Sequence, residues 1–74
     1  MANVVLNANG LRCPEPVLKI AAKSADLTPG DTLEVVADCP TFEKDVRTWC
    51  ERLKKTLLWV RQEDAGAVRV QIQF

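Results

Sequence analysis

The C-terminal end of the chain alternates strictly between apolar and polar side chains. The apolar positions are Val68, Val70, Ile72 and Phe74, and the polar positions between them are Arg69, Gln71 and Gln73. A period of two predicts a β-strand with one buried face and one face in water. A sheet with one wet face takes its helices on the other face. The pattern therefore predicts a fold of two layers, one sheet and one layer of helices.

Strands and helices are expected to alternate along the rest of the chain. Strands are predicted at 4–8, 32–37 and 57–62, before the final one at 68–74. Helices are predicted to follow Cys13-Pro14 and Asp38-Cys39-Pro40. The order is βαβαββ, with right-handed crossovers between parallel strands and an antiparallel pair at the end. We predict a single α+β domain over 1–74, with a four-stranded mixed sheet and both helices on one face.

Apolar residues at helical spacing predict which face of each helix is buried. On the first helix these are Val17, Leu18, Ala21 and Ala25. On the second they are Phe42, Val46, Trp49, Cys50 and Leu53. Cys50 is thus interpreted as a core residue, and Trp49 and Trp59 as core or rim.

Charge and hydropathy exclude several classes of function. Ten basic and ten acidic residues cancel, and no basic stripe indicates direct nucleic-acid binding. No apolar run approaches the ~20 residues that span a membrane. The first five residues do not have the pattern of a signal peptide. We therefore expect a cytoplasmic protein without membrane contact.

The cysteines are Cys13, Cys39 and Cys50, and the chain has no histidine. An odd number of cysteines fits a reducing compartment better than a disulfide framework. The cysteines lack the paired C-x-x-C spacing that indicates a zinc site. We therefore expect neither a metal nor a cofactor. Without histidine the common Cys–His nucleophile pair is excluded. A reactive thiol here needs activation by backbone dipoles, nearby cations or a partner.

Cys13 is the strongest candidate for such a thiol. It directly precedes Pro14, which we expect in the first helical turn, where proline is tolerated. Unpaired N–H groups and the positive end of the helix dipole favour a thiolate there, and Arg12 adds positive charge. The simpler interpretation is that Cys13 is a small buried apolar residue. It fits less well, because Arg12 and Pro14 flank the thiol.

The same segment resembles a known family. Leu6-Asn7-Ala8 and the run Gly10-Leu11-Arg12-Cys13-Pro14-Glu15-Pro16-Val17 are similar to the N-terminal signature of the TusA/SirA family of sulfur carriers. The resemblance continues through 28–31 and 37–40. It implies a fold like that of the C-terminal domain of translation initiation factor three. It also implies that Cys13 accepts a sulfane sulfur as a persulfide, as a carrier rather than a stand-alone enzyme.

The resemblance further implies protein partners. Sulfur donors of the family are cysteine desulfurases or rhodanese-like proteins, and acceptors are DsrE-type proteins or enzymes of sulfur oxidation. The pathways are tRNA thiolation, cofactor biosynthesis or sulfur oxidation. The expected docking residues around Cys13 are Arg12, Pro14, Glu15, Pro16 and Lys19, with Leu11 and Lys23 beside them.

Cys39 departs from the family pattern, which usually has an acidic residue there. It precedes Pro40 as Cys13 precedes Pro14, and both strand-to-helix turns are expected at one end of the sheet. One hypothesis is that Cys39 attacks a persulfide on Cys13 or takes its sulfur. The other is that Cys39 replaces an acidic helix cap without a role in chemistry. Two further functions stay open: a thiol redox or regulatory protein that uses Cys13 and Cys39, and an interaction module without cysteine chemistry.

Overall fold

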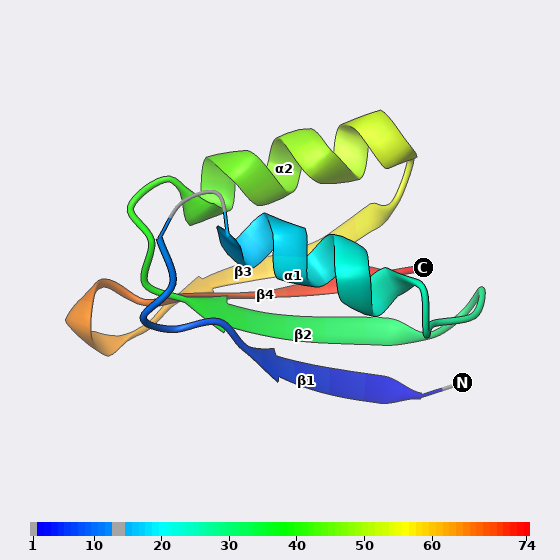
Figure 1. The fold of residues 1–74 in the computed structure, drawn as a ribbon, viewed down its shortest axis with the longest axis horizontal. Coiled ribbons are helices and arrows are strands. Elements are labelled where there is room, and N and C mark those ends of the chain that lie inside the picture. Colours follow the sequence, from blue (N-terminus) through cyan, green and yellow to red (C-terminus); the bar gives the residue numbers. More distant parts are fainter. Residues whose placement is uncertain (1, 13–14) are drawn as a thin grey trace.

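A computed structural model of the protein describes residues 2–12 and 15–74. The elements are β1 (Asn3–Asn7), α1 (Glu15–Ser24), β2 (Thr32–Ala37), α2 (Phe42–Leu53), β3 (Thr56–Gln62) and β4 (Val68–Gln73), with a short 3₁₀ turn at Asp64–Gly66. Both helices lie on one face of the sheet (Figure 1). The predicted α+β class, the order βαβαββ and the two layers are confirmed.

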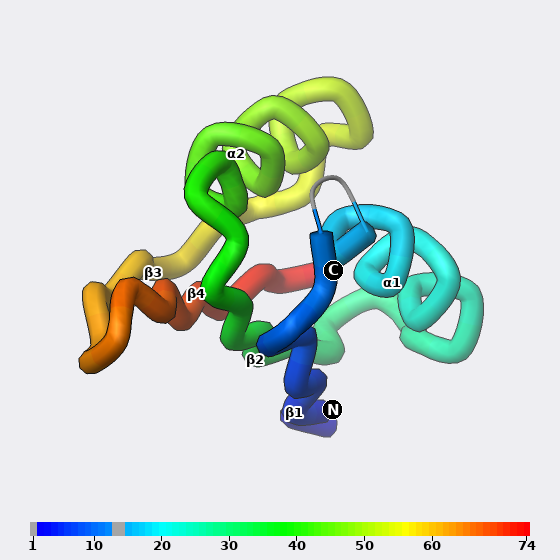
Figure 2. The backbone as a smooth tube through the Cα atoms, turned by 60° about the vertical axis from the view of Figure 1, so that its left-hand side comes forward, coloured from blue at the N-terminus to red at the C-terminus, as the bar shows by residue number. Residues whose placement is uncertain are grey.

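The sheet is mixed and has the strand order β1-β2-β4-β3. β1 pairs with β2 in parallel, and β4 lies antiparallel to both β2 and β3. Strands β2 and β3 therefore run in the same direction with β4 between them. Figure 2 shows the two helices side by side above the twisted sheet.

The core fills the space between the sheet and the helices. Its largest fully buried side chains include Leu33 and Val35 of β2, and Val70 and Ile72 of β4. Ile20 of α1, and Phe42 and Val46 of α2, meet them from above. Each such side chain contributes about 1.5–3 kcal/mol by leaving water. The alternation predicted for β4 is confirmed, because Arg69 and Gln71 lie on the opposite face and stay partly exposed.

The buried face predicted for α1 is wrong for Leu18, Ala21 and Ala25, and only Val17 of that set packs against the core. Pro16 and Ile20 are buried and Val17 is half-buried, whereas Leu18 is 61% exposed. Successive residues of a helix turn by about 100°, so Leu18 lies roughly 200° from Pro16 and points to solvent. Ala21 is exposed as well, and Ala25 lies beyond the end of the helix.

The face predicted for α2 is largely confirmed. Phe42, Val46 and Cys50 are buried and Trp49 is half-buried, but Leu53 is 51% exposed because it is the last helical residue. Lys54 follows with φ +58°, a left-handed conformation that ends the helix.

Candidate functional site

The two strand-to-helix turns lie together at one end of the sheet. The backbone N–H of Ala8 donates to the carbonyl oxygen of Val36, with a donor–acceptor distance of 2.7 Å. The backbone N–H of Gly10 donates to Oδ1 of Asp38, with a distance of 3.0 Å. These bonds tie the chain that follows β1 to the end of β2 and to the turn after it. The expected juxtaposition of the two turns is thus present.

The turn after β1 has local bonds of its own. Oδ1 of Asn7 accepts a hydrogen bond from the N–H of Asn9 at 2.9 Å, a turn that asparagine side chains commonly form. Gly10 has φ +83°, in the region that glycine adopts without strain. A side chain at this position would strain the backbone, although the space around it is open.

Cys13 and Pro14 lie outside the described residues, so the state of the Cys13 thiol stays a prediction. The residues on either side are joined directly: the N–H of Glu15 donates to the carbonyl oxygen of Arg12 at 2.6 Å. Glu15 is the first residue of α1. In the sequence, Cys13 therefore comes two residues before the helix whose N–H groups were expected to favour its thiolate.

The predicted docking residues divide into exposed and buried ones. Arg12, Glu15 and Lys19 are exposed. Pro16 is fully buried, so it packs beneath the start of α1 and is not part of an exposed rim. Among the described members of the predicted set, the charged side chains are therefore the ones that a partner can reach.

Cys39 lies in the turn between β2 and α2 and is 5% exposed. The expectation that it occupies a cap position of α2 is wrong. The helix begins at Phe42 with Thr41 as its N-cap residue, and the Phe42 N–H donates to the carbonyl oxygen of Cys39 at 3.0 Å. The Sγ atom lies 3.6 Å from Oγ1 of Thr41. Cys39 is part of the buried cluster beneath the turns.

Asp38 is a candidate positioning residue that the sequence analysis missed. Its side chain is the acceptor that holds Gly10, from 28 positions along the chain. The available signal was a polar residue directly after a buried strand. Its partner is a backbone N–H, which no side-chain pattern reveals.

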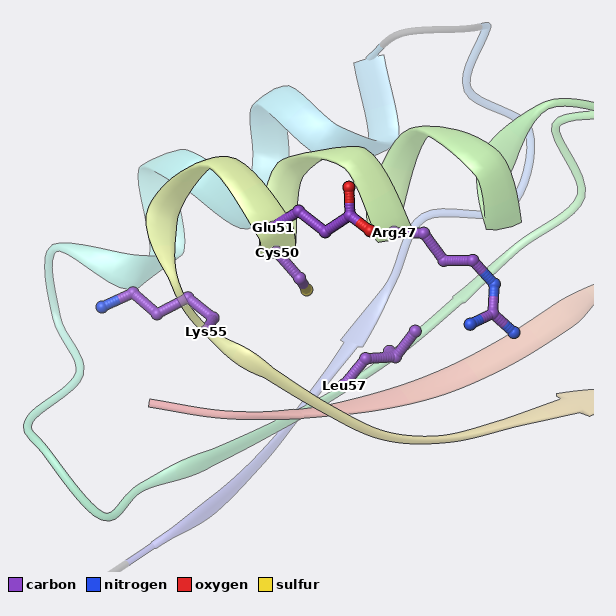
Figure 3. Close-up of a pocket in the computed structure, with 5 residues that line it drawn as sticks. All are labelled: Arg47, Cys50, Glu51, Lys55 and Leu57. Carbon is purple, nitrogen blue, oxygen red and sulfur yellow. The ribbon is translucent and has the colours of Figure 1, made fainter.

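Cys50 is a free, buried thiol with 3% exposure. It lies at the base of a pocket between α2 and β3, lined also by Arg47, Glu51, Lys55 and Leu57 (Figure 3). Burial raises the pKa of the Cys50 thiol, so the nucleophilic thiolate is disfavoured. The interpretation of Cys50 as a core residue is confirmed.

In 2–12 and 15–74, no group of three or more histidine, cysteine, aspartate or glutamate residues could hold a metal ion. Neither described helix is long and apolar enough to cross a membrane.

Comparison with known proteins identifies the family. The family model described as sulfurtransferase TusA matches residues 4–74. This chain belongs to the TusA family. The predicted resemblance is therefore confirmed over nearly the whole chain.

Two curated members of the TusA family illustrate the relationship. The sulfur carrier protein TusA of Pseudomonas paraeruginosa is 41% identical over 64 residues, which cover 86% of this chain and 80% of the relative. The protein of the same name from Pseudomonas aeruginosa matches equally well.

A solved structure has the same fold as this chain. The SirA-like protein from Desulfitobacterium hafniense superposes with a TM-score of 0.80. The match covers 99% of this chain and 96% of that one, at 23% sequence identity. At this identity the comparison shows the fold alone.

Proposed function

We propose that this protein carries sulfane sulfur as a persulfide on Cys13 and passes it to an acceptor protein in a sulfur relay. The observation that carries the proposal is the Cys-Pro-x-Pro sequence at 13–16, whose last two residues begin α1, in a chain of the TusA family. Its relatives are named sulfur carrier proteins. The three cysteines fit a reducing compartment, so the relay is proposed to work in the cytoplasm.

Both transfers are exchanges at a sulfur atom. On loading, the Cys13 thiolate attacks the outer sulfur of a donor persulfide. A new S–S bond forms while the donor's S–S bond breaks, and the electron pair leaves with the donor cysteine as a thiolate. On unloading, an acceptor thiolate attacks the outer sulfur on Cys13, and Cys13 leaves as a thiolate. Neither step needs an added oxidant or reductant.

The described residues support presentation of this thiol to protein partners. The Gly10–Asp38 bond and the Glu15–Arg12 bond hold the chain before and after Cys13-Pro14. Arg12, Glu15 and Lys19 supply exposed charges nearby, which steer the encounter with a partner of complementary charge. The partners proposed are a cysteine desulfurase or rhodanese-like donor and a DsrE-type acceptor.

Mass spectrometry of the intact protein tests the proposal. The protein is incubated with a cysteine desulfurase and cysteine, and its mass is measured without reductant. We expect a gain of one sulfur that a thiol reductant reverses. The gain should be lost in Cys13→Ser and kept in Cys50→Ala, the matched control at the buried thiol. No gain from any sulfane donor would overturn the proposal.

The Cys39→Ser variant tests whether the second thiol reacts with the persulfide. If Cys39 attacks the inner sulfur of a Cys13 persulfide, hydrosulfide leaves and a disulfide joins the two residues. Wild-type protein then accumulates disulfide after loading and Cys39→Ser does not. Equal disulfide yields contradict this step. A reversible disulfide that forms without any sulfane sulfur would instead favour the redox alternative.

A further inference from the structure

The β1 strand has one unpaired side. It lies at the edge of the sheet (Figure 1), and within the described residues it pairs with β2 alone. Its sequence, Asn-Val-Val-Leu-Asn, contains no charge and no proline. Its register with β2 runs without a shift from Asn3↔Thr32 to Asn7↔Val36. Exposed edges usually carry charges, prolines or bulges that prevent further pairing, and β1 has none of them.

The opposite edge of the sheet is different. β3 has a register shift between Leu57 and Trp59, which leaves Leu58 outside the regular pairing with β4. It also carries Arg61, which is exposed. A bulge and a charge are two of the usual means of protecting an edge. The open edge at β1 is therefore a specific property of that strand.

A shallow groove lies between β1 and α1. Leu6, Lys19, Ala22, Lys23 and Asp26 line it. Leu6 and Ala22 form its apolar part, and the two lysines outnumber the single carboxylate. Neither lysine has an ion-pair partner among the described residues. On the other face of the strand, Val5 is 60% exposed.

We propose that the β1 edge binds an extended, acidic segment of a partner protein as an additional strand. Backbone groups of the segment pair with the free side of β1, the mode by which exposed edges commonly bind peptides. Side chains alternate between the two faces of a strand. On the helix-side face an apolar side chain covers Leu6, and carboxylates meet Lys19 and Lys23.

Charge favours this occupant over a second copy of the chain. The β1 sequence is nearly symmetric about Val5, so an antiparallel β1–β1 pair is sterically reasonable. Such a pair places both α1 helices on the same face of the joined sheet. Lys19 and Lys23 of one copy then face the same residues of the other copy, and the like charges oppose that approach. The same lysines attract an acidic segment.

Two synthetic peptides test the proposal. In both peptides every second residue is threonine, so that the residues between them share one face. These residues are valine and glutamate in turn in one peptide, and valine and lysine in turn in the other. Binding is followed by amide NMR shifts and by hydrogen exchange of the full chain. We expect the acidic peptide to shift and protect the β1 amides, and the basic peptide to bind more weakly.

Charge-reversal variants make the test specific. Lys19→Glu combined with Lys23→Glu should weaken the binding of the acidic peptide by about tenfold or more. Lys44→Glu combined with Arg52→Glu, which makes the same change in net charge on α2, should leave binding unchanged. Equal binding of both peptides, an absence of β1 shifts, or β1 protection that depends on protein concentration alone would overturn the proposal. The test does not use Cys13, so its outcome is independent of the sulfur-carrier function.

Discussion

The carboxylate of Asp38 accepts a hydrogen bond from the backbone N–H of Gly10, with 3.0 Å between Oδ1 and N. The two residues are 28 positions apart and belong to the two turns that leave neighbouring parallel strands. Through this bond the turn after β2 holds the chain that leads to Cys13. We therefore propose Asp38 as a positioning residue for the carrier thiol.

The Asp38–Gly10 bond gives the first prediction. Asp38→Ala should slow sulfur loading of Cys13 severalfold, because the chain before Cys13 loses its anchor. The free energy of unfolding should fall by only about 1 kcal/mol. Time-resolved intact mass gives the loading rate, and urea denaturation gives the stability. Asp38→Asn retains the oxygen acceptor and should restore the rate. Loading of Asp38→Ala at the wild-type rate would contradict the positioning role.

Asp31 gives a prediction about pH. Its Oδ1 accepts the N–H of Ala2 at 2.9 Å, and its Oδ2 accepts the N–H and the hydroxyl of Thr28 at 3.0 and 3.1 Å. The backbone bonds from Thr28 and Ala2 lower the pKa of Asp31 below its ordinary value of 3.8.

The sign of the effect follows from the lowered pKa. The folded state binds this proton more weakly than the unfolded state, so the contribution of Asp31 is complete above its unfolded pKa. It is lost as the pH falls through the folded pKa. In Asp31→Asn the melting temperature should drop at neutral pH, because an amide nitrogen cannot accept the bonds that a carboxylate oxygen accepts. Its difference from wild type should shrink as the pH falls below 3.8 and through the lowered pKa of the folded state. A constant difference across this range would exclude the titration of Asp31 as the cause.

The orientation of α1 is tested by two neighbouring residues. Ile20 is fully buried, whereas Leu18 is 61% exposed. Ile20→Ala should cost about 2–5 kcal/mol of unfolding free energy, through lost burial and the cavity left behind. Leu18→Ala should change it by less than about 0.5 kcal/mol. Urea denaturation of both variants measures the difference. A larger loss for Leu18→Ala would mean that α1 is rotated.

Cys50 should be inert in the folded protein. Its thiol is 3% exposed and burial raises its pKa, so neither access nor thiolate formation favours reaction. In a variant with Cys13→Ser and Cys39→Ser, alkylation of Cys50 should be slow in buffer. It should rise steeply as urea unfolds the chain. Rapid labelling without urea would show that the pocket beside α2 opens.

Local patterns predicted the parts of the fold that depend on neighbouring residues. The alternation of Val68, Val70 and Ile72 identified the buried face of β4, since side chains of a strand point alternately to its two faces. The α1 stripe failed at Leu18, because α1 turned Pro16 and Ile20 to the core instead. A short helix with apolar residues on several sides leaves that choice to packing against the sheet.

The sequence by itself determined the class of the fold, the family, and Cys13 as the proposed carrier, since these depend on periodicity and on the order of residues along the chain. Tertiary structure alone decided that Asp38 holds Gly10, that Cys39 is buried before α2, and that β1 forms an open edge beside Lys19 and Lys23. Each of these depends on which segments pair across the sheet. Many pairings are compatible with the same local pattern, and the one adopted is the one that buries the whole core at once.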